Sequence, residues 1–165
     1  MQLITTPALT YNDVTLLPQY STLNSRQEVD LSTDFLDYHL AIPILSAPMD
    51  TVTDLNMQRA MRAAGGLGVH HRYCAPEVLL HAVTCGFGPI AVAPSLGIDF
   101  LAQIAAMCST ATVVLDVAHG DSQIVHTYAQ TACDLGLQVV SGNICTVEAA
   151  KFYVDIGAVL RVGIG

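Results

Sequence analysis

Basic residues are scarce in this chain, and their scarcity narrows the range of partners. Lysine and arginine number 6 against 14 aspartates and glutamates, the formal net charge is −8, and Lys151 is the only lysine. No cluster of positive charge exists to neutralise a phosphate backbone, so nucleic-acid binding is disfavoured. An anionic small molecule stays compatible with this composition, because backbone N–H groups at glycine turns and helix N-termini bind phosphate without basic side chains.

The chain also lacks a long hydrophobic run and a targeting signal. Hydrophobic residues make up 52% of the 165 residues, yet Gly, Pro, Asp and His interrupt every run before it reaches the ~20 apolar residues of a membrane span. The first residues, MQLITT, contain neither the basic nor the apolar segment of a signal peptide. We therefore expect one well-buried domain, no membrane association and a cytoplasmic location.

No two cysteines have the C-x-x-C spacing, and the number of cysteines is odd. A disulfide framework and a metal site are therefore both disfavoured. We expect reduced thiols that pack as small apolar side chains. The five cysteines are Cys74, Cys85, Cys108, Cys133 and Cys145.

Short apolar runs rich in β-branched residues recur at intervals of roughly 21–26 residues, which is the spacing of strand–helix units. Because these runs are continuously apolar, they predict a parallel sheet buried on both faces. The predicted strands are 42–45, 66–70, 90–93, 112–116, 138–141 and 159–162. The predicted helices are 56–64, 76–84, 100–107, 122–134 and 147–155.

Repeated strand–helix units predict either a doubly wound sheet or a (β/α)₈ barrel. No G-x-G-x-x-G follows the first strand, which argues against the dinucleotide-binding doubly wound fold. We therefore predict an α/β fold of the TIM-barrel type, here an incomplete barrel of about six βα units over residues 42–165. Residues 1–41 are polar and are predicted to form an extended arm whose short strands pack against the barrel.

Polar residues cluster directly after the predicted strands, at the edge that carries active sites in parallel α/β folds. After the first strand, Asp50 or Thr53 is a candidate helix N-cap. His70 and His71 follow the second strand, but a metal site is disfavoured there because we find no carboxylate or cysteine at ligand spacing.

Two further strand ends carry an acid and an amide. Asp116 ends the fourth predicted strand, where a carboxylate accepts hydrogen bonds from ribose hydroxyls or an amide, while Asp121 or Ser122 is expected to cap the next helix. Asn143 has the corresponding position one unit later, with a simple turn residue as the alternative interpretation.

Taken together, these segments resemble the IMP dehydrogenase/GMP reductase family. Each segment is weak alone, but all of them occur in order along nearly the whole chain. They are LTYNDV (9–14), VDLST (29–33), APMDTVT (47–53), GGLGVHHR (65–72), DVAHGDS (116–122), GNICT (142–146) and RVGIG (161–165).

The resemblance implies a barrel enzyme, commonly tetrameric, that binds a purine mononucleotide and a nicotinamide cofactor at the C-terminal ends of its strands. In that family a cysteine after the sixth strand attacks the purine and hydride passes to or from the cofactor. Carried over to this chain, the cofactor-binding residues are Asp116, Asn143, Arg161 and His71, with His70 and Arg72 near the cofactor channel. The substrate-binding residues are Ser46, Met49, Gly163 and Gly165, with Ala47 in the same turn.

The resemblance places the catalytic cysteine a few residues after Gly165, so none of the cysteines here is assigned that role, and Cys145 is interpreted as a small apolar residue. We expect the chain to be the N-terminal portion of a longer or split enzyme, completed by a C-terminal barrel portion. The family also implies a monovalent cation at the catalytic loop. Two alternatives stay open: a non-catalytic barrel fragment that binds nucleotide or a subunit, and another phosphate-binding barrel enzyme.

Within the family, the sequence points in two directions. The third strand follows His71 within roughly twenty residues, so no regulatory domain is inserted after the second strand; this and the triplet DVA at 116–118 favour GMP reductase. The segments at 29–33 and 47–53 favour IMP dehydrogenase, and so do His71 and Arg72 in the segment after the second strand, where reductases often carry lysine. We favour the dehydrogenase, which oxidises IMP with NAD, over the reductase, which reduces GMP with NADPH.

Overall fold

The computed structural model describes residue 7 and residues 9–164. It divides the chain between Asp30 and Leu31 into two units, which are described separately. The first unit contains two short 3₁₀ helices, η1 (Tyr11–Asp13) and η2 (Arg26–Glu28). The carboxylate of Asp13 accepts hydrogen bonds from the backbone N–H and the hydroxyl of Thr10, at 2.7 Å and 2.8 Å. Hydrogen bonds between a side-chain oxygen and a nearby backbone N–H stabilise both of these 3₁₀ helices.

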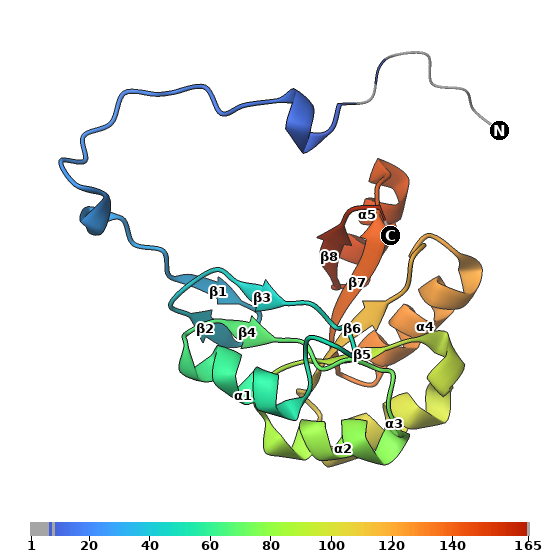
Figure 1. The fold of residues 1–165 in the computed structure, drawn as a ribbon. Coiled ribbons are helices and arrows are strands. Elements are labelled where there is room, and N and C mark those ends of the chain that lie inside the picture. Colours follow the sequence, from blue (N-terminus) through green and yellow to red (C-terminus); the bar gives the residue numbers. More distant parts are fainter. Residues whose placement is uncertain (1–6, 8, 165) are drawn as a thin grey trace. The chain divides into compact units, whose positions relative to one another are not determined.

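The second unit alternates strands and helices in the α/β manner (Figure 1). Its strands are β1 (Thr33–Phe35), β2 (Tyr38–Leu40), β3 (Leu45–Ser46), β4 (Leu67–Gly68), β5 (Ile90–Val92), β6 (Thr112–Asp116), β7 (Gln138–Ile144) and β8 (Val159–Val162). Its helices are α1 (Leu55–Ala63), α2 (Pro76–Cys85), the 3₁₀ helix η3 (Pro94–Leu96), α3 (Ile98–Met107), α4 (Gln123–Asp134) and α5 (Val147–Asp155). In the described part of the chain, no helix is long and apolar enough to cross a membrane.

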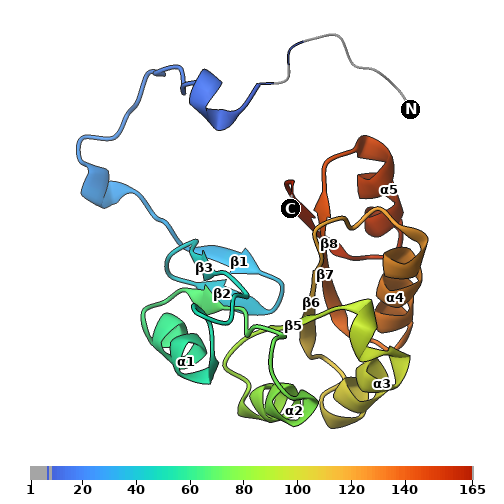
Figure 2. The same ribbon diagram turned by 45° about the vertical axis from the view of Figure 1, so that its right-hand side comes forward.

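The strands that follow the hairpin are parallel, as the sequence predicted. β5, β6, β7 and β8 form one sheet in chain order, and β3 pairs with β4. A parallel bridge between His70 and Ile90 joins the two groups. Figure 2 shows α1 to α5 following one another around the outside of these strands. The fold is consistent with a TIM-barrel family, and the described strands leave the barrel open.

Two hydrophobic clusters bury the two faces of the sheet. On one face, residues such as Val113 and Leu115 pack against the helices. On the other face, Ala91, Val114 and Val140 occupy paired register positions on β5, β6 and β7, and they cluster with Val69. Burial on both faces explains why these strands are continuously apolar in the sequence.

The hairpin formed by β1 and β2 lies at the N-terminal ends of the parallel strands. Phe35 and Leu36 pack against the inner cluster of the sheet. The side-chain amide of Gln138, the first residue of β7, donates to Asp37 Oδ2 at 2.5 Å. This packing agrees with the short strands expected in the arm, while the predicted boundary after residue 41 stays a prediction. The opposite ends of the strands are left free for a site.

The start of α1 corrects one expectation. Neither Asp50 nor Thr53 caps this helix; the cap is Asp54, whose Oδ1 accepts from the backbone N–H of Met57 at 2.9 Å. Thr53 is fully buried, and its hydroxyl bonds to Ala47 O at 2.6 Å. The hydroxyl therefore closes the turn after β3 and does not reach the helix backbone.

Gln58 links α1 to two strands, and its replacement tests this link. The side chain is fully buried, and its Nε2 donates to Gly68 O at 3.1 Å and to Pro89 O at 2.8 Å. Gln58→Leu leaves both carbonyl oxygens without this donor, so we expect a loss of about 2–3 kcal/mol in the free energy of unfolding, measured by urea denaturation. Gln123→Leu, at an exposed position of α4, is the control and is expected to change stability by less than about 0.5 kcal/mol. Equal stability of the two variants would contradict the linking role.

Candidate functional site

Three neighbouring strands bring an acid, an amide and a base together at their C-terminal ends. Asp116 ends β6 opposite Gly142 of β7, and Gly142 lies opposite Arg161 of β8. Asn143 follows Gly142 directly. Arg161 Nη1 donates to Asp116 Oδ1 at 3.0 Å. The structure therefore assembles Asp116, Asn143 and Arg161 at one edge, as the strand-end positions predicted.

Asp116 has a second basic partner in Arg72. Arg72 Nε donates to the backbone carbonyl of Asp116 at 3.1 Å and lies 3.5 Å from its Oδ2. The Arg72 guanidinium also stacks over the Tyr73 ring, 4.5 Å from its centroid. The Asp116 side chain is 18% exposed, so both ion pairs are only partly accessible to solvent. Two guanidinium groups thus orient one carboxylate, a pairing that sequence reasoning did not find.

Ser46 and Arg161 line a cavity of about 300 Å³ between the strands. The rest of the lining is mostly apolar and includes Val114 and Val140 of the inner cluster. Ser46 Oγ lies 2.8 Å from Thr53 Oγ1. Because the single Thr53 hydroxyl proton goes to Ala47 O at 2.6 Å, Ser46 donates to Thr53, and its own oxygen keeps lone pairs that can accept a hydrogen bond from a ligand.

The other predicted substrate residues are less closely placed. Met49 is 52% exposed in the turn after β3 and does not line this cavity. Gly163 lies beside the end of β7, because its N–H donates to Ile144 O at 2.9 Å. Gly165 lies outside the described residues.

Asn143 lies within β7, so the turn interpretation was wrong for this residue. Its backbone N–H donates to Val117 O at 3.1 Å, and its carbonyl accepts from Gly120 N at 2.8 Å. The loop after β6 therefore holds Asn143 in place. Its side-chain Oδ1 is buried and has no hydrogen-bond partner among the described residues. That oxygen is an unused hydrogen-bond acceptor at this strand edge.

His71 is positioned by backbone contacts after β4. Its N–H donates to Thr53 O at 3.0 Å, and its ring Nδ1 accepts from the Tyr73 N–H at 3.1 Å. Burial lowers the pKa of His71, with neighbouring His70 acting in the same direction, so the ring is neutral at neutral pH. Among the described residues, no hydrogen bond or ion pair joins His71 to Asp116; Arg72 next to it makes that contact.

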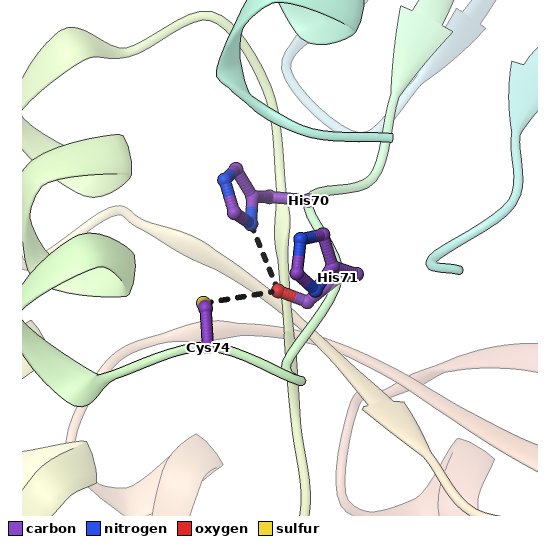
Figure 3. A group of neighbouring side chains, drawn as sticks. All are labelled: His70, His71 and Cys74. Atoms are coloured by element: carbon purple, nitrogen blue, oxygen red, sulfur yellow. Dashed lines mark hydrogen bonds between the residues drawn. The ribbon is translucent and has the colours of Figure 1, made fainter. Parts of the chain in front are cut away.

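The segment after β4 corrects the expectation that no cysteine lies at ligand spacing from the histidine pair. One ligand atom each from His70, His71 and Cys74 lie within 4.8 Å of one another. The spacing H-x-x-C at 71–74 was the signal that could have identified this group. Figure 3 shows the three side chains gathered around the carbonyl oxygen of His71.

A second cleft, of about 450 Å³, lies between α4 and the turn that leads into α3. Ile98, Ile124 and Tyr128 are among its lining residues. The Tyr128 hydroxyl is buried without a hydrogen-bond partner among the described residues, and burial raises its pKa. No sequence pattern marks this cleft, because Tyr128 has the spacing of an ordinary buried residue of α4.

Known proteins similar to this chain carry two names. The inosine-5'-monophosphate dehydrogenase of Korarchaeum cryptofilum is 50% identical over 70 residues, which are 42% of this chain and 14% of that protein. The inosine-5'-monophosphate dehydrogenase of Cryptosporidium parvum is 28% identical over 206 aligned residues, covering 95% of this chain and 51% of that protein. The GMP reductase of Lactococcus lactis subsp. cremoris is 27% identical over 164 residues, covering 94% of this chain and 50% of that protein.

The chain thus spans about half the length of the Cryptosporidium parvum and Lactococcus lactis relatives, both of which align along nearly all of it. The family model of the IMP dehydrogenase / GMP reductase domain matches residues 8–85 and 89–165, which include every strand and helix of the second unit. The unmatched residues 86–88 lie in the link between α2 and β5. On this match, the chain belongs to the IMP dehydrogenase/GMP reductase family.

Proposed function

We propose that this chain forms the N-terminal part of the catalytic barrel of a purine nucleotide oxidoreductase of the IMP dehydrogenase type, which converts IMP to XMP with NAD. The observation that carries the proposal is the pairing of Asp116 with Arg161 beside the cavity lined by Ser46. Family membership supports it, and so do the relatives named as dehydrogenases.

The residues present fit a nicotinamide cofactor. The Asp116 carboxylate, oriented by Arg72 and Arg161, has further lone pairs that accept from ribose hydroxyls or an amide N–H. Asn143 Oδ1 is a buried acceptor without a partner among the described residues, which suits an amide donor. When bound, the cofactor supplies the hydride acceptor. The protein's part is to hold the cofactor in one orientation.

The purine nucleotide is proposed to occupy the cavity lined by Ser46 and Arg161. The Ser46 oxygen accepts a hydrogen bond from the ligand while its own proton is held by Thr53 Oγ1. Met49 and Gly163 are proposed to contact the nucleotide from the rim, and His71 the cofactor. Gly165 is assigned by resemblance alone.

The remaining barrel portion, which the longer relatives contain, is proposed to supply the nucleophilic cysteine and a monovalent cation site. The described strands support this proposal, because β8 and β3 have no further parallel neighbours to close the barrel. Unpaired strand edges expose backbone N–H and C=O groups that a complementary portion would satisfy. We further propose a cytoplasmic homotetramer for the completed protein.

The second cleft is proposed to bind the flat adenine ring of the cofactor between Ile98 and Ile124, with the Tyr128 hydroxyl as a polar contact. Tyr128→Phe then weakens cofactor binding roughly tenfold, measured by calorimetry on the intact native protein, because one hydrogen bond to the ligand is lost. The variant changes stability by less than about 0.5 kcal/mol, since the hydroxyl has no partner in the described structure.

The matched control for this test is Tyr153→Phe. The Tyr153 hydroxyl donates to Gly120 O at 2.5 Å, so its removal is expected to lower stability by about 1 kcal/mol. Unchanged cofactor affinity in Tyr128→Phe would exclude a hydrogen bond from this hydroxyl to the cofactor.

GMP reductase is the second candidate, and specific features favour it. The triplet DVA at 116–118 and the uninterrupted link from His71 to β5 are typical of the reductases. The GMP reductase of Leishmania donovani is also 44% identical over 70 residues of this chain. The cofactor would then be NADPH, and the same Asp116 would meet its nicotinamide end.

Assays on the intact protein isolated from its native source distinguish the candidates. Formation of NADH from NAD in the presence of IMP supports the dehydrogenase, and consumption of NADPH in the presence of GMP supports the reductase. The same preparation is examined by intact mass, which shows whether one polypeptide or two complete the barrel. If a preparation with a complete barrel binds nucleotide but catalyses neither reaction, the non-catalytic alternative replaces both.

A further inference from the structure

The loop after β4 contains a compact group of metal-ligating side chains outside the Asp116–Arg161 edge. His70 and His71 are 1% and 8% exposed, and Cys74 is half-buried. Their ligand atoms lie within 4.8 Å of one another. We propose that His70, His71 and Cys74 bind a borderline-soft divalent cation such as Zn²⁺, with a fourth coordination position open to water.

Two of these ligand atoms are directed at the same point. The His70 Nδ1–H donates to the carbonyl oxygen of His71 at 2.8 Å, and the Cys74 thiol lies 3.7 Å from the same oxygen (Figure 3). A bound cation replaces these two hydrogens, and the carbonyl oxygen that accepts them turns aside, because a cation about 2.0 Å from Nδ1 does not fit between two atoms 2.8 Å apart. The thiol proton leaves to solvent, and the His70 ring keeps one proton by moving it from Nδ1 to Nε2. The cation is then bound by the His70 Nδ1 atom and the Cys74 thiolate, which without the cation both donate to the His71 carbonyl oxygen.

The movement that binding requires is small. Zn–N and Zn–S distances of about 2.0 and 2.3 Å place tetrahedral ligand atoms about 3.3–3.6 Å apart, so a separation of 4.8 Å closes by about 1.2–1.5 Å. The backbone of His70 is held on both sides, since its N–H donates to Pro89 O at 2.9 Å and its carbonyl accepts from Ala91 N at 2.8 Å. Cys74 lies in the irregular segment before α2, so we expect Cys74 and not His70 to move when the cation binds.

The chemistry of the donors selects the class of cation. Two imidazole nitrogens and one thiolate favour Zn²⁺ or Co²⁺ over Mg²⁺ and Ca²⁺, which prefer oxygen ligands. Three protein ligands with one open position also match the ligand number of zinc sites that keep a bound water. The site shares His71 with the proposed cofactor contact, but its test is independent of the proposed function, because no readout involves a purine nucleotide or hydride transfer.

The chain offers an internal control in a second histidine–cysteine pair. His81 and Cys85 lie one turn apart on α2, with Cys85 Sγ 3.6 Å from His81 Nε2. This pair supplies only two ligands at a more exposed position. If cation binding at the chain were merely adventitious coordination by a nearby thiol and imidazole, the α2 pair would contribute as much as the loop group.

The test is a titration of the full chain with Co²⁺, followed through the thiolate-to-cobalt absorption band. We expect one equivalent of Co²⁺ to produce the band and Zn²⁺ to displace it. Cys74→Ser is expected to abolish the band and to weaken Co²⁺ binding roughly tenfold or more, while Cys85→Ser leaves both unchanged. Zn²⁺ is expected to raise the melting temperature of the native chain and of Cys85→Ser, but not that of Cys74→Ser.

Three results would overturn the proposal: no band in the native chain, a band retained by Cys74→Ser, or a band lost only in Cys85→Ser. Circular dichroism of Cys74→Ser without metal checks that the variant is folded, and Cys74→Ala provides a second variant if the serine hydroxyl disturbs the loop. Because no readout uses activity, a negative result leaves the proposed oxidoreductase function untouched.

Discussion

Replacing Gly142 with alanine is expected to lower the free energy of unfolding by about 3 kcal/mol or more and to separate β8 from β7. An added Cβ would overlap the carbonyl oxygen of Arg161 and lie 2.6 Å from the Arg161 Cβ. Neither strand can move aside, because Gly142 and Arg161 are direct partners in the β7–β8 ladder. Urea denaturation followed by circular dichroism measures the loss.

Gly136→Ala separates this overlap from ordinary backbone strain. Gly136 has a φ of +84°, but the nearest atom to an added Cβ is 3.7 Å away. Only the left-handed conformation is then disfavoured, at a cost of about 1 kcal/mol. If Gly142→Ala is no less stable than Gly136→Ala, the Cβ added at residue 142 does not overlap Arg161, and the predicted close contact of β7 with β8 is wrong.

Asp116→Asn is expected to weaken binding of the nicotinamide cofactor roughly 10- to 100-fold in the intact native protein, if the proposed function holds. Asparagine keeps the size of the side chain but removes its negative charge and replaces one acceptor oxygen with a donor. Arg72 and Arg161 then lose the negative charge that they share, although Arg72 keeps its hydrogen bond to the backbone carbonyl of residue 116, so the orientation of the strand edge is weakened. Calorimetric titration with NAD and with NADP measures the effect and identifies the preferred cofactor.

Asp134→Asn provides the matched control, since the same chemical change is made at the end of α4. Among the described residues, the Asp134 carboxylate accepts a local hydrogen bond from Gln130 Nε2 at 2.9 Å. Its variant is expected to bind cofactor as the native protein does. Equal affinities in the two variants would remove Asp116 from the cofactor site, and a thermal melt of each variant shows whether a change in binding reflects a change in folding.

The elements that the sequence predicted at their observed bounds carry strong local signals. The strand Thr112–Asp116 is a continuous apolar run, and the helix Val147–Asp155 starts at Thr146, whose hydroxyl accepts from Ala149 N at 3.3 Å. The first strand was predicted at 42–45 but is found at Leu45–Ser46. Its bounds depend on pairing with Leu67 and Gly68, which lie far along the chain, and no local pattern specifies such a partner.

In the candidate site, the positions of the residues could likewise be predicted from the sequence, but their partners could not. The strand-end positions of Asp116, Asn143 and Arg161 followed from the strand–helix order, because parallel strands place their C-terminal ends at one edge. Their partners did not follow. The contact of Arg72 with Asp116 joins residues 44 positions apart, and the approach of Cys74 to His70 and His71 depends on how the loop before α2 folds back.

The sequence by itself determined the order of parallel strands and helices and the segments by which the family is identified, because apolar periodicity, caps and motifs are local properties of the chain. Only the tertiary structure decided that Asp116 lies between two arginines, that Asn143 presents a buried acceptor without a partner among the described residues, and that Cys74 joins the histidine pair. These arrangements depend on strand register and loop closure, and both are set by packing between residues distant in the chain.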